Sequence, residues 1–453
     1  MIQKQVTKLE KLAMDAYVYG FPLLFNVEQM RRYVEEGIGA NVATPFNQFS
    51  HAKTLATPAD TFVSINNDTV YSMAQLDLSV GPIALHVPNT EGRYYVLQFV
   101  DAWTNNFAYV GTRAIGAEAA DFLLTPPNWV GEVPKHMTQI KVPTRLASIV
   151  GRWACQDEHD LKNIMALQDL TTLRTLHASA EPQGFPIVSE DVPEEIRFFE
   201  RLRVTMLDLL PAPQDMALQA SFSALGMEAS VTSPLLGLDE TVYNALKYAN
   251  VSGLGLIKRT LLSGVSESEN GWRITFHAFD YNTDFFEIGT KEDAEWIITD
   301  RKKAFMERAV AAMGGLWGNH GYEAAYVMTW TDEKGQTLNG AHNYTLTLDP
   351  LPPVAAFWSI TMYNAPDYYL VDNPWHRYSI GDRTSGLIYN EDGSLTIYMS
   401  VDEPQNEREK ANWLPLPDGD FRPILRMYAP DQRILSRDYS FAPIKREGNM
   451  GRK

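Results

Sequence analysis

The feature that most constrains the fold of this chain is a change in the spacing of its apolar residues at about Asn66. Before that point they recur at i, i+3, i+4, i+7 and i+8, which is the spacing of one helical face. The residues that set this spacing are Leu9, Leu12, Ala13, Ala16 and Tyr17. From Asn66 to about Val150 the period falls to two, which is typical of strands. Helical and strand patterns in separate stretches predict an α+β fold.

Two regions are predicted to be mainly helical. Residues 1–40 form an N-terminal helical segment, which Gly20 and Pro22 are expected to break or kink. Residues 157–320 form a middle region with a strand pair near residues 272–279. The helix starts expected in this region are N-caps at Asp191 and Asp239 and a capping box from Thr290 to Asp293.

Two β-sandwich domains are expected, over residues 41–156 and 321–453. In the first, residues 93–100 and 107–112 are rich in aromatic and β-branched types and predict a β-hairpin. In the second, the Asp392–Gly393 turn predicts another hairpin. Short strands with frequent turns favour sandwiches of jelly-roll type over a parallel sheet.

The charge of the chain argues against nucleic acid as a partner. Its 453 residues include 39 basic and 56 acidic side chains, a formal charge of −17, and an acidic surface repels phosphate backbones. The longest early uncharged run, Ala16–Val27, contains Gly20 and Pro22 and is too short to span a membrane. We expect no membrane span, and a cytoplasmic protein as written or a periplasmic one if a signal was removed. The single Cys155 excludes an intrachain disulfide.

Familiar catalytic motifs are absent from the sequence, including the nucleophile elbow, the phosphate-binding loop and the dinucleotide fingerprint. The nine histidines never fall at the i, i+4 spacing that places two metal ligands on one helical face. Residues Asp280–Asp284 space oxygen side chains as in a calcium loop but lack its glycine and closing glutamate. We therefore expect no metal and no other cofactor.

The candidate site residues are polar groups that stand beside aromatic ones. Ile65–Ser72 contains two amides, a carboxylate and hydroxyls next to a strand, and Asp101–Asn106 contains a carboxylate, an indole and two amides at a hairpin tip. Such groups are satisfied either by turn backbone or by a ligand. The candidate catalytic residues are Asp68, Asp101 and Arg93. The candidate substrate-binding residues are Asn66, Asn67, Tyr71, Trp103, Asn105, Trp413 and Arg426.

Two interpretations of these groups stay open. A carboxylate near apolar walls can act as a general acid or base, while aromatic faces and amides suit a sugar. This predicts an enzyme that acts on a small polar or saccharide-like molecule. Alternatively, the polar groups close turns and tie sheet layers together, and the chain is a non-catalytic binding or assembly protein. In both cases we expect a homo-oligomer, because aromatic-rich sheets often leave apolar area to cover.

Two sets of motifs lie in the two halves of the chain. The first set is Tyr17–Pro22, Asn66–Tyr71, Gly92–Tyr95 and Asp101–Asn106. The second set is Phe357–Thr361, Tyr363, Tyr378–Ile380, Asp392–Ser394, Asn412–Pro415, Pro417, Arg426 and Tyr428. In this order they resemble the paired bacterial families known as domains of unknown function 1254 and 1214. The resemblance implies a jelly-roll sandwich in each half with helices between and around them, similar in outline to double jelly-roll viral coat proteins, and it supplies no agreed catalytic residues.

Overall fold

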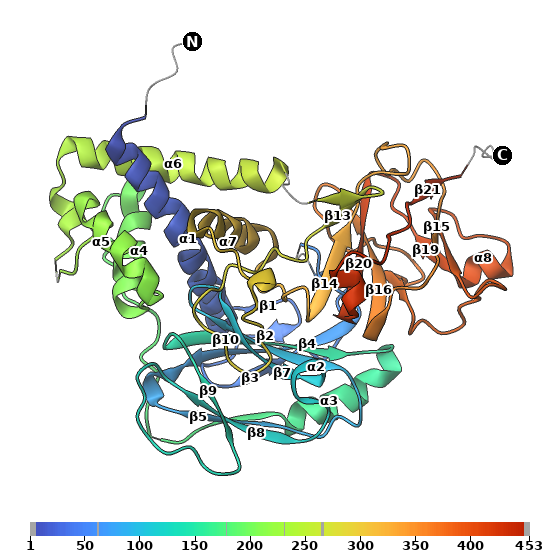
Figure 1. Ribbon diagram of the computed structural model, residues 1–453, viewed down its shortest axis with the longest axis horizontal. Helices are drawn as coiled ribbons and strands as arrows, with labels where there is room; N and C mark the ends of the chain where they lie inside the picture. Colours follow the sequence, from blue (N-terminus) through green and yellow to red (C-terminus); the bar gives the residue numbers. More distant parts are fainter. Residues whose placement is uncertain (1–5, 61–62, 178, 231, 264–266, 448–453) are drawn as a thin grey trace.

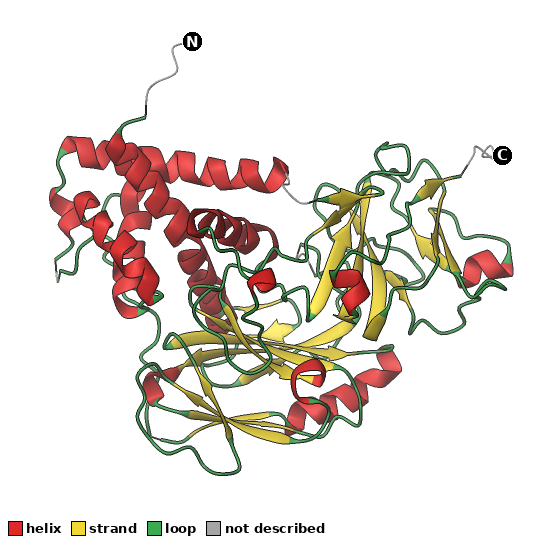
Figure 2. Cartoon of the chain, viewed as in Figure 1, coloured by secondary structure: helices red, strands yellow, loops and turns green. Residues whose placement is uncertain are grey.

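The computed structural model describes residues 6–60, 63–177, 179–230, 232–263 and 267–447. Its architecture is α+β, as predicted, and it has three parts: a helical layer, a first β unit and a second β unit (Figure 1). The helices gather on one side of the first β unit, and the second β unit lies beside both (Figure 2).

The helical layer rests on one face of the first β unit. Its main helices are α1 (Lys8–Glu35), α4 (Arg197–Asp208), α5 (Met216–Ser221), α6 (Glu240–Ser263) and α7 (Arg301–Gly315). Met73, Val100 and Val150 of the sheet belong to the same apolar cluster as the buried helix side chains. Burial of the apolar helix faces against this sheet therefore stabilises the layer.

Helix α1 is continuous, so the predicted break at Gly20 and Pro22 is wrong. A Cβ atom at Gly20 would come within 2.3 Å of the Leu202 side chain on α4. The glycine is therefore needed for the close approach of two helices. Pro22 removes one backbone donor, but tertiary packing on both sides outweighs that loss.

Only one of the three predicted helix starts is confirmed. The Asp239 carboxylate accepts hydrogen bonds from the first backbone N–H groups of α6, as an N-cap does. The start of α7 is instead capped by Asp300. The predicted cap residue Thr290 lies in a local turn, where its hydroxyl donates to the carbonyl of Glu287. Asp191 caps no helix, since α4 follows a short 3-10 turn that begins after Pro193.

The first β unit consists of two sheets that face each other. One has the spatial order β3 (Phe49–His51), β4 (Thr69–Asp77), β10 (Leu146–Ala154), β6 (Tyr95–Asp101) and β7 (Asn106–Gly111). The other has the order β11 (Thr172–Thr175), β5 (Ile83–Val87), β8 (Ala120–Thr125) and β9 (Thr138–Lys141). Val70, Leu97 and Ile149 of the first sheet share one core with Leu85 and Leu124 of the second. The predicted hairpin is confirmed, since β6 and β7 pair antiparallel.

Shorter elements surround this unit. They are β1 (Gly37–Ile38), β2 (Asn41–Val42), α2 (Thr112–Ile115) and α3 (Leu161–Leu170). The amide of Gln168 on α3 donates to the Ser72 hydroxyl at 3.2 Å, which ties this helix to β4.

The second β unit repeats the two-sheet arrangement. One sheet has the order β12 (Ser268–Glu269), β13 (Trp272–Ile274), β14 (Ala324–Met328), β20 (Phe421–Pro430), β16 (Val354–Asn364) and β17 (Ser379–Gly381). The other has the order β19 (Trp413–Pro415), β18 (Leu395–Ser400), β15 (Tyr344–Leu348) and β21 (Lys445–Arg446), with the helices α8 (Glu407–Ala411) and α9 (Gln432–Leu435) nearby. Val327, Ile360 and Leu425 meet Leu346 and Ile397 in its core.

The hairpin predicted around Asp392–Gly393 is wrong, although a turn forms there. Gly393 donates to the carbonyl of Asn390 at 3.0 Å, but β18 pairs with β15 and β19. The side chain of Asn412 bonds both the N–H and the carbonyl of Ile388. A side-chain amide thus satisfies the backbone that a partner strand was expected to satisfy.

The six-stranded sheet of the second unit has one apolar face and one polar face. Side chains alternate along each strand, so the residues between those of the core point the other way. Tyr326 on β14, Arg426 on β20 and Ser359 on β16 form one row across this polar face. The row lies against the first β unit, where Asp68 accepts a hydrogen bond from Ser359.

Asn26 joins the helical layer to the first β unit. This fully buried residue of α1 donates to the carbonyls of Asp101 and Ala102, both at 3.0 Å, and accepts from the Trp317 indole at 2.8 Å. Asn26→Ala leaves these groups unpaired, so we expect the free energy of unfolding to fall by about 2–4 kcal/mol in denaturant titrations. The exposed Lys11→Ala on the same helix is the control and should change it by less than about 0.5 kcal/mol. Equal stability of both variants would contradict this role.

Candidate functional site

Asp68 lies buried where the two β units meet. Its Oδ1 accepts a hydrogen bond from the Tyr428 hydroxyl at 2.8 Å, and its Oδ2 accepts one from the Ser359 hydroxyl. The Arg383 guanidinium donates to the Asp68 carbonyl at 2.9 Å. Within the described ranges, no basic side chain forms an ion pair with this carboxylate. A buried carboxylate solvated by two hydroxyl groups is the central feature of the site.

The asparagines that precede Asp68 fold the turn that carries it. The Asn66 Oδ1 accepts from the Thr69 N–H at 3.1 Å and from the Thr69 hydroxyl at 3.0 Å, and its Nδ2 donates to the Tyr71 hydroxyl at 3.0 Å. The Asn67 Nδ2 donates to the carbonyl of Ala56 at 2.6 Å. These contacts satisfy both amides with the protein's own groups and fix the entry of the chain into β4.

Arg152 brings a positive charge from the first β unit to the same place. It lies opposite Tyr71 in the β4–β10 register, and its guanidinium donates to the Gln98 side chain and to the Trp317 carbonyl, both at 2.8 Å. Burial raises the pKa of Tyr326 in the second unit, while Arg152 and then Arg426 oppose that rise. The Tyr326 phenol therefore lies in the field of guanidinium groups from both units.

Arg426 holds the segment before β4 onto the second unit. Its Nη1 donates to the Thr361 hydroxyl at 3.0 Å, and its Nη2 donates to the Ser64 carbonyl at 2.7 Å. The group at this junction is called the seam cluster below. Its members are Asp68, Tyr71, Arg152, Tyr326, Ser359, Arg422, Arg426 and Tyr428.

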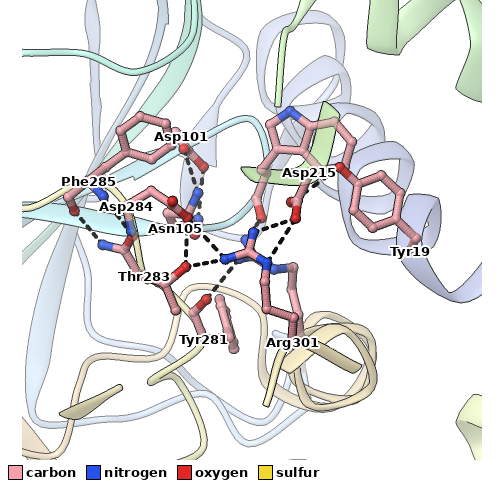
Figure 3. Close-up of polar contacts among 12 residues, drawn as sticks. Tyr19, Asp101, Asn105, Asp215, Tyr281, Thr283, Asp284, Phe285 and Arg301 are labelled. Carbon is pink, nitrogen blue, oxygen red and sulfur yellow. Dashed lines mark hydrogen bonds and ion pairs between the residues drawn. The ribbon is translucent and has the colours of Figure 1, made fainter. Parts of the chain in front are cut away.

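A second polar group lies at the hairpin tip, where Figure 3 shows Asp101 and Asn105; Trp103 of the same tip belongs to it. Both carboxylate oxygens of Asp101 accept from Asn105, from its N–H and from its side-chain amide, each at 2.8 Å. The Trp103 indole donates to the carbonyl of Leu209 at 3.0 Å. The adjacent cavity measures about 10 Å³, which is room for one water molecule. This group closes the hairpin and docks it to the helical layer.

Arg301 completes that second group, as Figure 3 shows. Its guanidinium forms an ion pair with Asp215 and reaches Asp284 at 3.3 Å, and it also donates to the Thr283 hydroxyl. The side-chain oxygens of Thr283 and Asp284 are thus used by a cation of the protein itself. No set of three histidine, cysteine or acidic side chains in the described part of the chain is arranged to hold a metal ion.

The predicted site residues Arg93 and Trp413 lie away from both groups. Arg93 forms a two-bond ion pair with Asp160, with N–O distances of 2.6 and 2.7 Å, and donates to the Ala154 carbonyl. Trp413 lies in β19, in the sheet of the second unit that faces away from Asp68, and its indole donates to the Ser400 carbonyl at 3.0 Å. Both side chains have the contacts of structural residues.

One groove lies on the helical layer. This groove of about 620 Å³ runs between α1 and residues 184–190. Its ionisable groups are solvated, as the Arg31–Glu35 ion pair illustrates with exposed fractions of 36% and 52%. None of the predicted site residues lines it.

Sequence reasoning missed Arg152, Arg422 and Ser359. A signal for the first existed, since Arg152 interrupts an otherwise apolar strand from Leu146 to Ala154. Arg422 and Arg426 fall on the same face of β20 because they are four residues apart in a strand. Their convergence on Ser64 depends on the packing of the two units, which no local pattern contains.

The family comparisons match the two β units. A protein family of unknown function, DUF1254, matches residues 46–175, and another, DUF1214, matches residues 323–432. The chain pairs these two families. The seam cluster therefore lies where a DUF1254 and a DUF1214 domain meet. No curated protein matches the chain significantly.

A solved structure shares the fold of the chain. The VPA0106 protein of Vibrio parahaemolyticus is 24% identical to the chain with a TM-score of 0.72, over 97% of this chain and 100% of that one. An uncharacterised protein of Burkholderia cenocepacia is 11% identical with a TM-score of 0.44, over 97% and 93% of the two chains. The first supports the fold, and the second is too distant to carry an argument. In the described residues, no helix is both long enough and apolar enough to cross a membrane.

The environment of Asp101 predicts a pH effect on stability. Burial raises the pKa of this carboxyl from 3.8 to about 6, although bonds from Asn105 oppose the rise. The folded state then binds the proton more tightly than the unfolded state, so stability is highest below the unfolded pKa and falls as pH rises to about 6. Asp101→Asn removes this titration, and its amide can pair with a flipped Asn105. Denaturant titrations from about pH 4 to about pH 7 should show wild type losing roughly 3 kcal/mol relative to the variant. Parallel stability curves would show that burial does not perturb Asp101.

Proposed function

We propose that the chain is an enzyme that acts on a small polar molecule at the seam cluster, with Asp68 as the general acid or base. The observation that supports this is that hydroxyl groups, rather than an ion pair, solvate the buried carboxylate. A hydroxyl group can donate to a carboxylate and can also accept from a carboxyl group, whereas a guanidinium can only donate, so this environment suits a group that acts as acid or base.

The neighbours of Asp68 suit such chemistry. Burial and then the charge of Asp68 hold the pKa of Tyr428 well above its usual range, so its phenol stays a proton donor at neutral pH. Arg152 and Arg426 supply positive charge for an anionic or carbonyl group of the substrate. Tyr71 and Tyr326 are only half-buried, and their rings and hydroxyls suit a saccharide-like ligand. Asp101 and Arg93 are left out of this proposal, because their polar atoms are bonded within the chain.

The alternative is a non-catalytic binding or assembly protein that forms a homo-oligomer. Two observations favour it. Strand β4 and the β6–β7 hairpin lie in one sheet of the first unit while β5 and β8 lie in the other, so the chain crosses repeatedly between the sheets, as in jelly-roll-like sandwiches. The donors of the second unit also satisfy the backbone of residues 64–68, so the seam cluster has the contacts of a structural joint. Neither alternative decides the compartment of the protein, and a cytoplasmic and a periplasmic location are compatible with both.

Asp68→Asn distinguishes the alternatives. We expect sugars or small organic acids to raise the melting temperature of wild type, since a ligand that binds only the folded state stabilises it. Once a substrate is found, the variant should lose at least about 100-fold in kcat, because a general acid or base contributes that much.

Glu200→Gln is the matched control, since Glu200 is also a buried carboxylate but lies in the helical layer, bonded to Arg203 and Ser233. It should lower the melting temperature and keep both ligand binding and turnover. Unchanged turnover in Asp68→Asn would refute the catalytic role. If no compound shifts wild type and Asp68→Asn is merely less stable, the assembly alternative is favoured.

A further inference from the structure

Arg422 is a buried cation with few partners. Only 6% of the residue is exposed. Its Nη2 donates to the Ser64 hydroxyl, and its buried Nε has no hydrogen-bond partner. An unpaired buried donor on a charged group is costly, so this position calls for an explanation.

Several buried or partly buried arginines elsewhere in the chain are paired with acids, although the buried Arg308 donates to backbone carbonyls instead. Arg113 pairs with Glu323, Arg145 with two aspartates, and Arg203 with Glu200. Arg152, Arg422 and Arg426 of the seam cluster form no ion pair within the described residues, and Asp68 is the carboxylate among the groups that raise the pKa of Arg426. In a chain with a net charge of −17, the seam cluster thus concentrates uncompensated positive charge.

Aromatic rings stabilise part of the Arg422 charge. Its guanidinium carbon lies 3.9 Å from the ring centre of Tyr368, 5.5 Å from that of Trp330 and 5.6 Å from that of Tyr363. Burial nevertheless lowers the pKa of Arg422 to about 10: Tyr363 and Tyr368 oppose this fall only in part, Arg426 adds to it, and no carboxylate is among the groups that oppose it. The rings hold the side chain in place without neutralising it.

Both arginines of β20 converge on Ser64. Arg422 donates to its hydroxyl and Arg426 to its carbonyl. Ser64 has a positive φ of 59°, an uncommon conformation for a residue other than glycine. Neutral oxygens of one strained residue therefore occupy the space between two guanidinium groups, where a charged oxygen would bind more strongly.

We propose that Arg422 and Arg426 bind an oxyanion group, a carboxylate or a phosphate, of the molecule that the seam cluster recognises. This inference rests on the proposed function and names the class of its substrate. The oxyanion accepts from the unpaired Nε of Arg422 and neutralises the excess charge. Asp68 lies on the Tyr428 side of Arg426 and is left to exchange protons with another part of the same molecule.

The test compares wild type with Arg422→Met in thermal unfolding. Without ligand, the variant should melt within about 2 °C of wild type, because it removes an unpaired buried charge as well as its ring contacts. Arg203→Met is the matched control and should melt several degrees lower, because it leaves Glu200 buried and unpaired. A fall as large as that of the control would show that Arg422 is a structural residue.

The same melting experiments are repeated with two anions, succinate as the carboxylate and inorganic phosphate as the phosphate, each from about 1 to about 100 mM. Sodium chloride at matched ionic strength and glucose are the neutral comparisons. We expect one of the two anions to raise the melting temperature of wild type and to have no effect beyond that of sodium chloride on Arg422→Met. The anion that acts identifies the group.

Two outcomes overturn the inference. One is no shift of wild type with either anion, and the other is an anion shift that persists in Arg422→Met. If glucose or another sugar raises the melting temperature of wild type and of Arg422→Met but not of Asp68→Asn, the oxyanion is rejected and the proposed function stands. If an anion raises the melting temperature of wild type but not of Arg422→Met, and Asp68→Asn leaves substrate turnover unchanged, the oxyanion site stands and the proposed function is rejected.

Discussion

The hydrogen bonds from the second β unit to residues 64–68 are the contacts on which the relation of the two units depends. The Tyr363 hydroxyl donates to the Ile65 carbonyl at 2.6 Å, Arg426 donates to the carbonyl of Ser64, and Tyr428 donates to Asp68. A sheet face that carries arginines, tyrosines and serine cannot be buried without acceptors. One short segment of the first unit supplies them, so the segment sets how the units fit together.

Apolar packing completes this junction beside the polar contacts. Tyr94 and Val96 of the first unit share a cluster with Phe357 and Tyr428 of the second. Tyr428 takes part in both, since its ring stacks on Phe357 with 4.2 Å between centroids while its hydroxyl reaches Asp68. The junction is therefore rigid on one side and rich in charge on the other, which is the combination expected where polar chemistry needs fixed geometry.

The two polar groups of the molecule differ in how completely they are satisfied. At the hairpin tip, Asp101 receives two bonds from Asn105, and Arg301 is neutralised by acids. At the seam cluster, Arg422 has an unpaired donor and Arg152 has no carboxylate partner. Both groups combine carboxylate, guanidinium and aromatic side chains, and on residue type alone both were candidate sites. What distinguishes a structural group from one that can bind a ligand is whether its donors and charges already have partners in the protein. Those partners are distant in sequence.

The sequence by itself determined the α+β class, the N-terminal helix, the β6–β7 hairpin, the cap of α6 and the family pairing, because these depend on residues near one another in the chain. The tertiary structure alone decided the rest. Pro22 stays inside a helix because Leu202 packs against its turn, and residues 387–389 are not a strand because Asn412 satisfies their backbone. Asp68 and Tyr428 meet although 360 residues separate them. Contacts between residues so far apart in the sequence form only when whole sheets dock, and the local spacing of residues contains no information about that docking.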